Sequence, residues 1–372
     1  MSNERLVLTD INRRDPLGKY FLANNIDFDF LPVAPEVPMV DMIADRIKNK
    51  HDVVLVLTFG YFIDENGKSR EAVLERLFRE VSQYNDFSEL RRSITLIIYK
   101  NGDLLERLHD KRRDYPDFCK WLNSLRPIIL TDGRPGESLK NSYIDCEFVE
   151  LQTPNVQMDN VMPEFSTLKR HDPKTDYLCL MRDQNRKPAR RWLNEKILAC
   201  GLQRNMIYKF NRKENPFEDL ESQFPQKLVD GFGWKEIVPP VAYYNQTNAE
   251  LVVETMCHDN DDTFYLTEKT TKPITMMHPF MVLSNKGFLK NLCDLGFRTF
   301  NEYFDESYDR EPQIDKRIQI ITQNLMDLRG RTYEIYRDSQ KIRQHNLLNL
   351  QHLSGEYYTN FWKNMDNVWK NI

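Results

Sequence analysis

The run DVVLVLTF at positions 52–59 is almost continuously apolar and rich in β-branched side chains. Apolar residues that follow one another without alternation predict a strand buried on both faces, as in a parallel sheet covered by helices. Two similar runs follow, SITLIIY at 93–99 and RPIILTD at 126–132. The sequence therefore predicts a parallel sheet of an α/β fold.

A helical pattern fills the interval between the first two runs. In the stretch 69–84 the apolar residues recur at helical spacing and define one face, formed by Val73, Leu74, Leu77, Phe78 and Val81. The segments 6–10 and 146–152 can add outer strands. We therefore expect a Rossmann-like domain over residues 1–155 and, because several prolines and little periodicity follow, a linker over 156–175.

The alternation of strands and helices then restarts. A strand is predicted at 176–181 and a helix at 189–201, where Trp192, Leu193, Ile197 and Cys200 share a face and Gly201 caps the end. Further strands are predicted at 206–210, 250–255, 264–267 and 279–284, with helices near 270–278 and 287–295. A second Rossmann-like domain over 176–330 follows, and amphipathic spacing beyond it predicts C-terminal helices over 331–372 that pack on the domains.

Composition narrows the class of protein. The 372 residues are 40% hydrophobic, which suffices for large cores, and the net charge of -4 shows no global basic field for nucleic acid. Six cysteines form no CxxC pair, the start resembles no signal peptide, and no run is long enough to span a membrane. We expect a soluble cytoplasmic protein.

The stretch TEKTTKPITMMHPF at 267–280 places a carboxylate and two lysines where a strand ends and a short helix begins. Ligands of doubly wound sheets bind at this edge, and a helix N-terminus with lysines suits phosphate, while a carboxylate suits the two hydroxyls of a ribose. Thr267, Glu268, Lys269 and Lys272 are therefore candidate ligand residues. Alternatively, Glu268 and Lys272, four positions apart, form an ordinary solvated helical ion pair.

A second basic cluster follows the first strand of the second domain. The sequence LCLMRDQNRKPARRW at 178–192 contains Arg182, Lys187 and Arg190 at the strand end and the following helix start. Guanidinium groups bind phosphate oxygens through two parallel hydrogen bonds, so a turn at this edge suits a diphosphate. The alternative interpretation is a solvated turn followed by the polar face of a helix.

These motifs resemble a group of glycosyltransferases common in tailed-phage and bacterial genomes. The resemblance covers roughly 176–330 and rests on matching positions in the basic turn, the TEKT helix start, the His-Pro-Phe strand and a Leu-Gly-Phe segment: Arg182, Thr267, Glu268, Lys269, Thr270, Lys272, Pro273, His278, Pro279, Phe280, Gly287, Leu295, Gly296 and Phe297. Met181 and Ala189 depart from the pattern, which has Asn and His there, so the preferred nucleotide or sugar differs from that of the group.

The group is similar to glycosyltransferases of the GT-B type, with two Rossmann-like domains facing across a cleft. The resemblance implies a nucleotide sugar, of the UDP-sugar class, in the second domain and the acceptor in the first. It places Glu268 at the ribose and Arg182, Lys269 and Lys272 around the diphosphate. His278 either faces the diphosphate or sugar, or is structural.

Glycosyl transfer also needs a base for the acceptor hydroxyl, and strand-end carboxylates of the first domain are the candidates: Asp10, Asp132 and Glu137. Each of them has the alternative role of a turn or cap residue. We interpret DNDD at 259–262 as a solvated loop and find no metal-binding DxD pattern, so cations and a helix N-terminus are expected to replace a metal ion, with no cofactor beyond the donor.

The acceptor is the least determined part of the function. Because the resemblance includes phage proteins, and several phage enzymes of the GT-B type glycosylate hydroxymethylated bases, modified double-stranded DNA is the leading acceptor and requires the base to flip out. A surface glycan or protein is the second acceptor. A non-catalytic nucleotide-sugar-binding protein is a further alternative, and a nucleotidyl- or phosphotransferase is disfavoured because the chain lacks a GxxxxGK[ST] loop.

Overall fold

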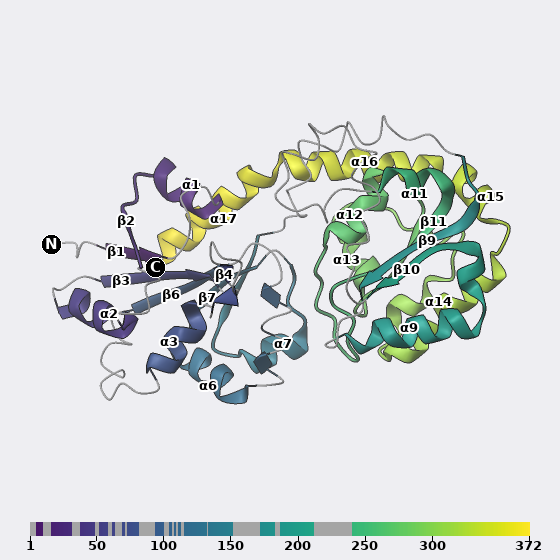
Figure 1. The fold of residues 1–372 in the computed structure, drawn as a ribbon. Helices are drawn as coiled ribbons and strands as arrows, with labels where there is room; N and C mark the ends of the chain where they lie inside the picture. The colour runs from purple at the N-terminus through teal and green to yellow at the C-terminus, as the bar shows by residue number, and fades with distance from the viewer. Residues whose placement is uncertain are drawn as a thin grey trace. The chain divides into compact units, whose positions relative to one another are not determined.

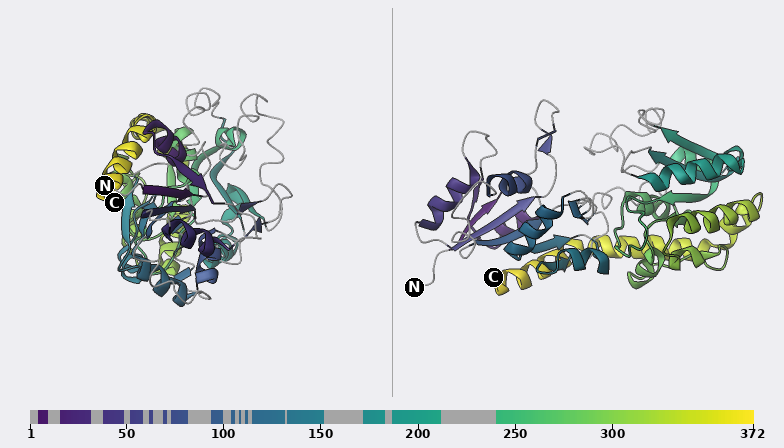
Figure 2. Two further views of the ribbon diagram at one scale, coloured as in Figure 1. Left: turned by 90° about the vertical axis from the view of Figure 1, so that its left-hand side faces the viewer. Right: turned by 90° about the horizontal axis from the view of Figure 1, so that it is seen from below.

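The computed structural model describes the following residues: 5–9, 16–31, 38–48, 52–58, 62–63, 69–70, 73–81, 94–99, 104–105, 108, 111–112, 115–131, 133–151, 172–182, 187–211 and 240–372. The chain divides into two compact units, the first comprising Met1–Gln152 and Tyr358–Ile372 and the second Thr153–Tyr357. Each unit contains one parallel β-sheet with helices packed on it (Figure 1, Figure 2). The predicted α/β class with two Rossmann-like sheets is confirmed. The domain boundaries inferred from the sequence stay a prediction.

The first unit is built on a six-stranded sheet of order β2-β1-β3-β6-β7-β8. All neighbouring strands in it run parallel. Their bounds are β1 Arg5–Thr9, β2 Phe28–Phe30, β3 Asp52–Thr58, β6 Ile94–Tyr99, β7 Ile128–Thr131 and β8 Glu147–Glu150. A short antiparallel pair, β4 Phe62–Ile63 and β5 Ser69–Arg70, follows β3. The central strand β3 is buried from Val53 to Leu57, which accounts for its unbroken apolar sequence.

Helices cover both faces of this first sheet. They are α1 Pro16–Ala23, α2 Met39–Lys48, α3 Val73–Val81, α6 Pro116–Leu125, α7 Glu137–Ser142 and the C-terminal α17 Tyr357–Asn371. In Figure 1, α1 and α17 lie on one face, and α2, α3 and α6 lie on the other. The rings of Phe21 and Trp369 pack with centroids 5.6 Å apart, and the Tyr20 hydroxyl donates to Asp366 at 2.7 Å. The last helix of the chain is thus part of the core of the first unit.

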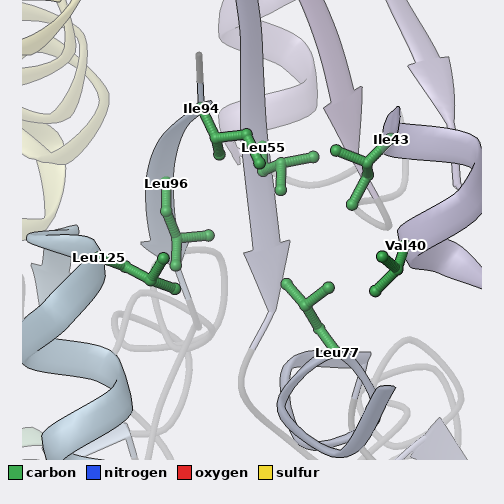
Figure 3. Close-up of a pocket in the computed structure, with 7 residues that line it drawn as sticks. All are labelled: Val40, Ile43, Leu55, Leu77, Ile94, Leu96 and Leu125. Atoms are coloured by element: carbon green, nitrogen blue, oxygen red, sulfur yellow. The ribbon is translucent and has the colours of Figure 1, made fainter. Parts of the chain in front are cut away.

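A small pocket lies between this sheet and the α2, α3 and α6 helices (Figure 3). Its lining is entirely aliphatic and consists of Val40, Ile43, Leu55, Leu77, Ile94, Leu96 and Leu125. Such a lining offers no hydrogen bond to a sugar or phosphate. The pocket is therefore a feature of core packing.

The second unit is built on a four-stranded sheet of order β10-β9-β11-β12, again with parallel neighbours. The strands are β9 Thr175–Arg182, β10 Met206–Asn211, β11 Thr247–Val253 and β12 Phe280–Leu283. The α-helices are α9 Pro188–Ala199, α11 Val241–Gln246, α12 Glu268–Thr275, α13 Phe288–Asp294, α14 Ile314–Asp327, α15 Thr332–Asp338 and α16 Gln340–Gly355. Short 3-10 helices span Leu202–Asn205 and Glu306–Arg310. In Figure 1, α9 and α14 cover one face of the sheet, and α11, α12 and α16 cover the other.

Two local expectations in this unit are wrong. Residues 264–267 form no strand, although Phe264, Tyr265 and Leu266 are all buried, because this apolar segment packs as a loop against the core. Trp192 was expected on the apolar face of its helix, but it is 44% exposed while Leu193 and Ile197 carry the burial. The predicted cap is confirmed: α9 ends at Ala199, and Gly201, the residue after the C-cap Cys200, adopts a positive φ of 64°.

Among the residues that the structure describes, no helix combines the length and the apolar character needed to cross a membrane.

Candidate functional site

The candidate site lies at the point where the second sheet changes its winding direction. The chain passes from β9 to β10 on one side and from β11 to β12 on the other, so the loops after β9 and β11 diverge. Open α/β sheets bind ligands in the crevice that forms at the carboxyl ends of such strands. The register pairs Ala249 with Tyr177 and Glu250 with Leu178, so β9 and β11 run side by side towards this edge.

Glu254 is the first residue after β11 and is completely buried. Its carboxylate accepts hydrogen bonds of 2.6 Å from the hydroxyl of Thr267 and of 2.6 Å from the hydroxyl of Thr270. Both threonines belong to the start of α12. The strand end and the helix start are therefore joined through a buried carboxylate.

Thr267 is the N-cap of α12. Its side-chain oxygen accepts from the backbone N–H of Lys269 at 3.2 Å, which satisfies one of the unpaired donors of the first turn. Pro273 lies inside the helix and supplies no N–H, and the helix ends two residues later at Thr275. The sequence therefore encodes a short, capped helix whose N-terminus lies at the carboxyl edge of the sheet.

Glu268 and Lys269 form a close ion pair at this N-terminus. The Lys269 Nζ donates to Glu268 Oε1 at 2.6 Å and to the Thr255 hydroxyl at 3.1 Å. Their side chains are 19% and 30% exposed, respectively. The Thr255 hydroxyl holds the lysine on the protein side, and both side chains remain partly exposed to solvent. A polar ligand could therefore contact the pair.

Electrostatics keep both members of this pair charged. Burial acts to raise the pKa of Glu268, but the charges of Lys269 and Lys272 outweigh it and hold this pKa at about 2. Burial acts to lower the pKa of Lys269, but the negative charges of Glu268 and Glu254 outweigh it and raise this pKa above its ordinary value. A full positive and a full negative charge are present at neutral pH.

Lys272 lies deeper than its neighbours and is only 8% exposed. An ion pair on a solvated helix surface, the alternative drawn from its spacing to Glu268, does not describe a side chain with this burial. Burial raises the pKa of Glu250 to about 8, against the opposing effects of the Tyr244 hydrogen bond and of the Lys272 charge. The charge of Lys272 thus lowers the pKa of two carboxyl groups, that of Glu268 at the start of α12 and that of Glu250 within β11.

Two of the predicted phosphate ligands reach the backbone of the same strand end. The Lys187 Nζ donates to the carbonyl of Thr255 at 3.1 Å, and an Arg190 guanidinium nitrogen donates to the carbonyl of Glu254 at 3.4 Å. Arg190 is 4% exposed, so it does not belong to the polar face of a solvated helix. The basic cluster after β9 and the TEKT segment therefore meet at Glu254 and Thr255, and their role as ligand residues stays a prediction.

The remaining candidates lie elsewhere or outside the described residues. Arg182 ends β9, and its backbone is opposite Asn211, while its side chain lies outside the described part of the structure. Asp10 and Asp132 also lie outside the described residues. Glu137 begins α7 of the first unit, where its 74% exposed carboxylate lies 3.5 Å from the amine of Lys140.

The structure does not bring His278 together with Glu268. His278 precedes β12 at the amino edge of the sheet, is 1% exposed, and its Nε2 lies 3.2 Å from the hydroxyl of Thr247. Its ring packs between Tyr244 and Tyr336, at centroid distances of 5.1 Å and 5.8 Å. These contacts favour the structural role among the two that the sequence left open.

The DNDD segment is a loop, as expected, but it is only partly solvated: Asp259 and Asn260 are exposed, whereas Asp261 is buried. Asp259 accepts from the backbone N–H of Ile314 at 2.6 Å, at the start of α14. Asp261 is 2% exposed and accepts from the N–H and the hydroxyl of Thr263 at 2.9 Å and 2.7 Å. Short-range turns and a helix start therefore use these carboxylates.

Sequence reasoning missed Glu254, Thr255 and Thr270 as parts of the site. Thr270 was counted among the matching positions, but no contact was assigned to it. The available signal was the polar pair Glu-Thr directly after the apolar run LVV, at the carboxyl end of a predicted strand. A buried acid at that edge is a candidate for contacts with the next helix start.

No family model and no curated protein matches the chain. Among solved structures, it is similar to the GtfA/B complex, with 10% identity and a TM-score of 0.33, over 87% of this chain and 60% of the other chain's length. It is also similar to a protein from Listeria monocytogenes described as a UDP-N-acetylglucosamine 2-epimerase, with 8% identity, a TM-score of 0.35 and 98% of each chain covered. Similarity at this level says nothing about substrates, and the α/β class rests on the two parallel sheets themselves.

Proposed function

We propose that this protein is a glycosyltransferase that moves a sugar from a nucleoside-diphosphate donor to a hydroxyl acceptor. The observation that carries the proposal is the Glu268–Lys269 ion pair at the N-terminus of α12, held over the carboxyl edge of the second sheet. One carboxylate beside several cations and a helix N-terminus matches a ribose followed by a diphosphate. A phosphate-only ligand would not need Glu268.

In this proposal each group of the site has a distinct task. Glu268 accepts hydrogen bonds from the two ribose hydroxyls, since its low pKa keeps it ionised. Lys269 and Arg182 contact the diphosphate, and Lys272 adds positive charge from below. When the bond between the anomeric carbon and the diphosphate oxygen breaks, negative charge grows on the leaving group, and these fixed cations stabilise it.

The same charges support a metal-independent reaction with a UDP-sugar as donor. The anomeric carbon forms its new bond to the acceptor oxygen, whose proton passes to a carboxylate of the first unit. Asp10, Asp132 and Glu137 remain the proposed candidates for this base. Lys187 and Arg190, which bind backbone carbonyls at the strand end, support the loop that carries Glu254 and Thr255.

For the acceptor, we propose a hydroxymethylated base in double-stranded phage DNA, with a surface glycan or protein as the second choice. The support for DNA is the resemblance of the 176–330 region to phage glycosyltransferases. Binding to DNA would weaken steeply as the salt concentration rises, because phosphate contacts release counterions. Transfer to a glycan or protein would show no such uniform dependence.

The test is a donor and acceptor screen on the purified chain. UDP-, GDP-, ADP- and dTDP-sugars are each incubated with DNA containing hydroxymethylcytosine, with unmodified DNA and with a glycan mixture, and nucleoside diphosphate release is measured. Release that depends on modified DNA supports the full proposal, and release with glycans alone supports the second acceptor. Binding of a nucleotide sugar without release would favour the non-catalytic binder, and absence of binding to any of them would contradict the proposal.

A further inference from the structure

Glu254 is a buried acid that accepts more hydrogen bonds than are needed to attach the α12 helix to the end of β11. Besides the two threonine hydroxyls, its oxygens accept from the backbone N–H of Thr255 at 3.1 Å and from that of Thr267 at 3.4 Å. These donors come from the end of β11 and from the start of α12. A carboxylate with four donors and no exposed surface has a single favourable arrangement.

The hydroxyl of Thr267 connects this carboxylate to Lys269. It donates its only proton to Glu254, so its lone pairs are left to accept from the backbone N–H of Lys269 at 3.2 Å and from Lys269 Nζ at 3.5 Å. The Thr255 hydroxyl accepts from the same Nζ at 3.1 Å. Glu254 therefore determines which way a hydroxyl points, and that hydroxyl holds the lysine.

We propose that Glu254 is a positioning residue for the diphosphate site. Its carboxylate orients the Thr267 hydroxyl as an acceptor for Lys269 and ties the first turn of α12 to the end of β11. Lys269 then presents its charge at the carboxyl edge without leaving its ion pair with Glu268. This inference rests on the proposed function, and it adds a residue that makes no contact with the ligand.

If Glu254 only attached the helix to the strand, replacing it with glutamine would lower stability and leave diphosphate affinity unchanged. The charged groups that act on the Lys269 amine are Glu268, Glu254 and Arg190, of which the first two raise its pKa and Arg190 lowers it. Replacing Glu254 with glutamine keeps its size but removes its charge, and the new amide can donate to the Thr267 hydroxyl and reverse its direction. The pKa of Lys269 shows whether the Glu254 charge acts on this amine, and diphosphate affinity shows whether that action matters to the site.

The first experiment follows the lysine side chains by NMR across pH, with the Lys269 signal assigned through Lys269→Met. We expect the wild-type pKa to lie above that of free lysine, and Glu254→Gln to lower it, because one of the two negative charges that raise it is removed. The matched control is Asp176→Asn, because Asp176 is also buried and accepts from the Thr332 hydroxyl at 2.5 Å and the Gly330 N–H at 3.0 Å, at the opposite edge of the sheet. It should lose stability without moving the Lys269 signal.

The second experiment measures UDP and GDP affinity by calorimetry at neutral pH and near pH 9.5. Glu254→Gln should bind the ligand roughly tenfold more weakly. The loss should be larger at the higher pH, because the lowered pKa of Lys269 in the variant lets this amine lose its proton there first. Wild-type affinity in Glu254→Gln overturns the inference and leaves the proposed function intact. A wild-type chain that binds neither of these diphosphates, nor ADP nor dTDP, overturns both. If Glu254→Gln does not fold, a wild-type Lys269 pKa at or below that of free lysine still refutes the inference.

Discussion

The carboxylate of Glu254 and the hydroxyl of Thr270 meet at 2.6 Å, across sixteen residues of chain. One belongs to a strand end and the other to the first turn of a helix, so the contact sets where that helix begins relative to the sheet. Every candidate ligand residue of the TEKT segment depends on this placement. The predictions below test the charges that it brings together.

Lys269→Met should lower the transfer rate by roughly tenfold to a thousandfold, because it removes a charge that the leaving diphosphate needs in the transition state. It should also reduce the free energy of unfolding by about 1–2 kcal/mol, since Glu268 loses its partner in a half-buried place. Steady-state turnover and chemical denaturation measure the two effects.

The matched control for this variant is Lys290→Met on α13. Lys290 pairs with Asp294 at 2.9 Å, but its side chain is 74% exposed. Its loss should leave turnover unchanged and alter stability by less than about 0.5 kcal/mol. Equal turnover in the Lys269 and Lys290 variants would contradict a diphosphate contact at Lys269.

Glu268→Gln should weaken nucleotide-sugar binding and also change the acid side of the stability profile. The folded pKa of Glu268 is about 2, below its ordinary value of 4.5, so its stabilisation is present above pH 4.5 and disappears as the pH falls towards 2. The difference in melting temperature between wild type and variant should therefore shrink across that window. A constant difference from pH 6 to pH 2 would show that the carboxylate is not held ionised by its neighbours.

Glu250→Gln should have the opposite pH dependence. Burial raises the folded pKa of Glu250 from 4.5 to about 8. The stability that the neutral carboxyl group gives the folded state is therefore fully present below pH 4.5 and is lost as the pH rises through about 8. Glutamine can still accept the 2.6 Å hydrogen bond from the Tyr244 hydroxyl. We expect the variant to gain stability relative to wild type between pH 5 and pH 9, and parallel melting curves over that range would refute this.

Turnover should persist in excess EDTA, because Lys269, Lys272 and the α12 N-terminus supply the positive charge that a metal ion provides in other transferases. The measurement compares nucleoside diphosphate release with and without the chelator. Complete loss of release that added manganese restores would overturn the metal-independent reaction.

The sequence predicted every strand of the two parallel sheets except the short β2, for a physical reason. Strands buried on both faces, such as β3 and β6, have unbroken apolar runs, and this local signal survives without knowledge of the fold. The same signal failed at Phe264 and Leu266, because a loop packed on the core buries its side chains as completely as a strand does. Burial and strand geometry are different properties that share one sequence pattern.

The sequence indicated which segments form the candidate site, but not which side chains contact one another there. The helix start at Glu268 followed from local patterns, but the strand expected to end at Thr267 is absent, and the helix reaches the sheet edge through contacts with Glu254 at the end of β11. The partner of the threonines, Glu254, lies in a different element, and a single sequence carries no signal for such a pairing. Likewise, the burial of Lys272 depends on packing between α12 and its neighbours, which spacing along one helix does not reveal.

The C-terminal helix α17 has a consequence for how the protein is made. Phe361 and Met365 are fully buried, and Asn364 donates to the carbonyl of Glu150 at 3.1 Å, so the first unit needs residues that follow the entire second unit in the chain. During synthesis, the first sheet therefore lacks the α17 helix on one face until the second unit has been translated. We expect chains stalled before residue 357 to be cut readily by protease in the first unit, and full-length chains to resist.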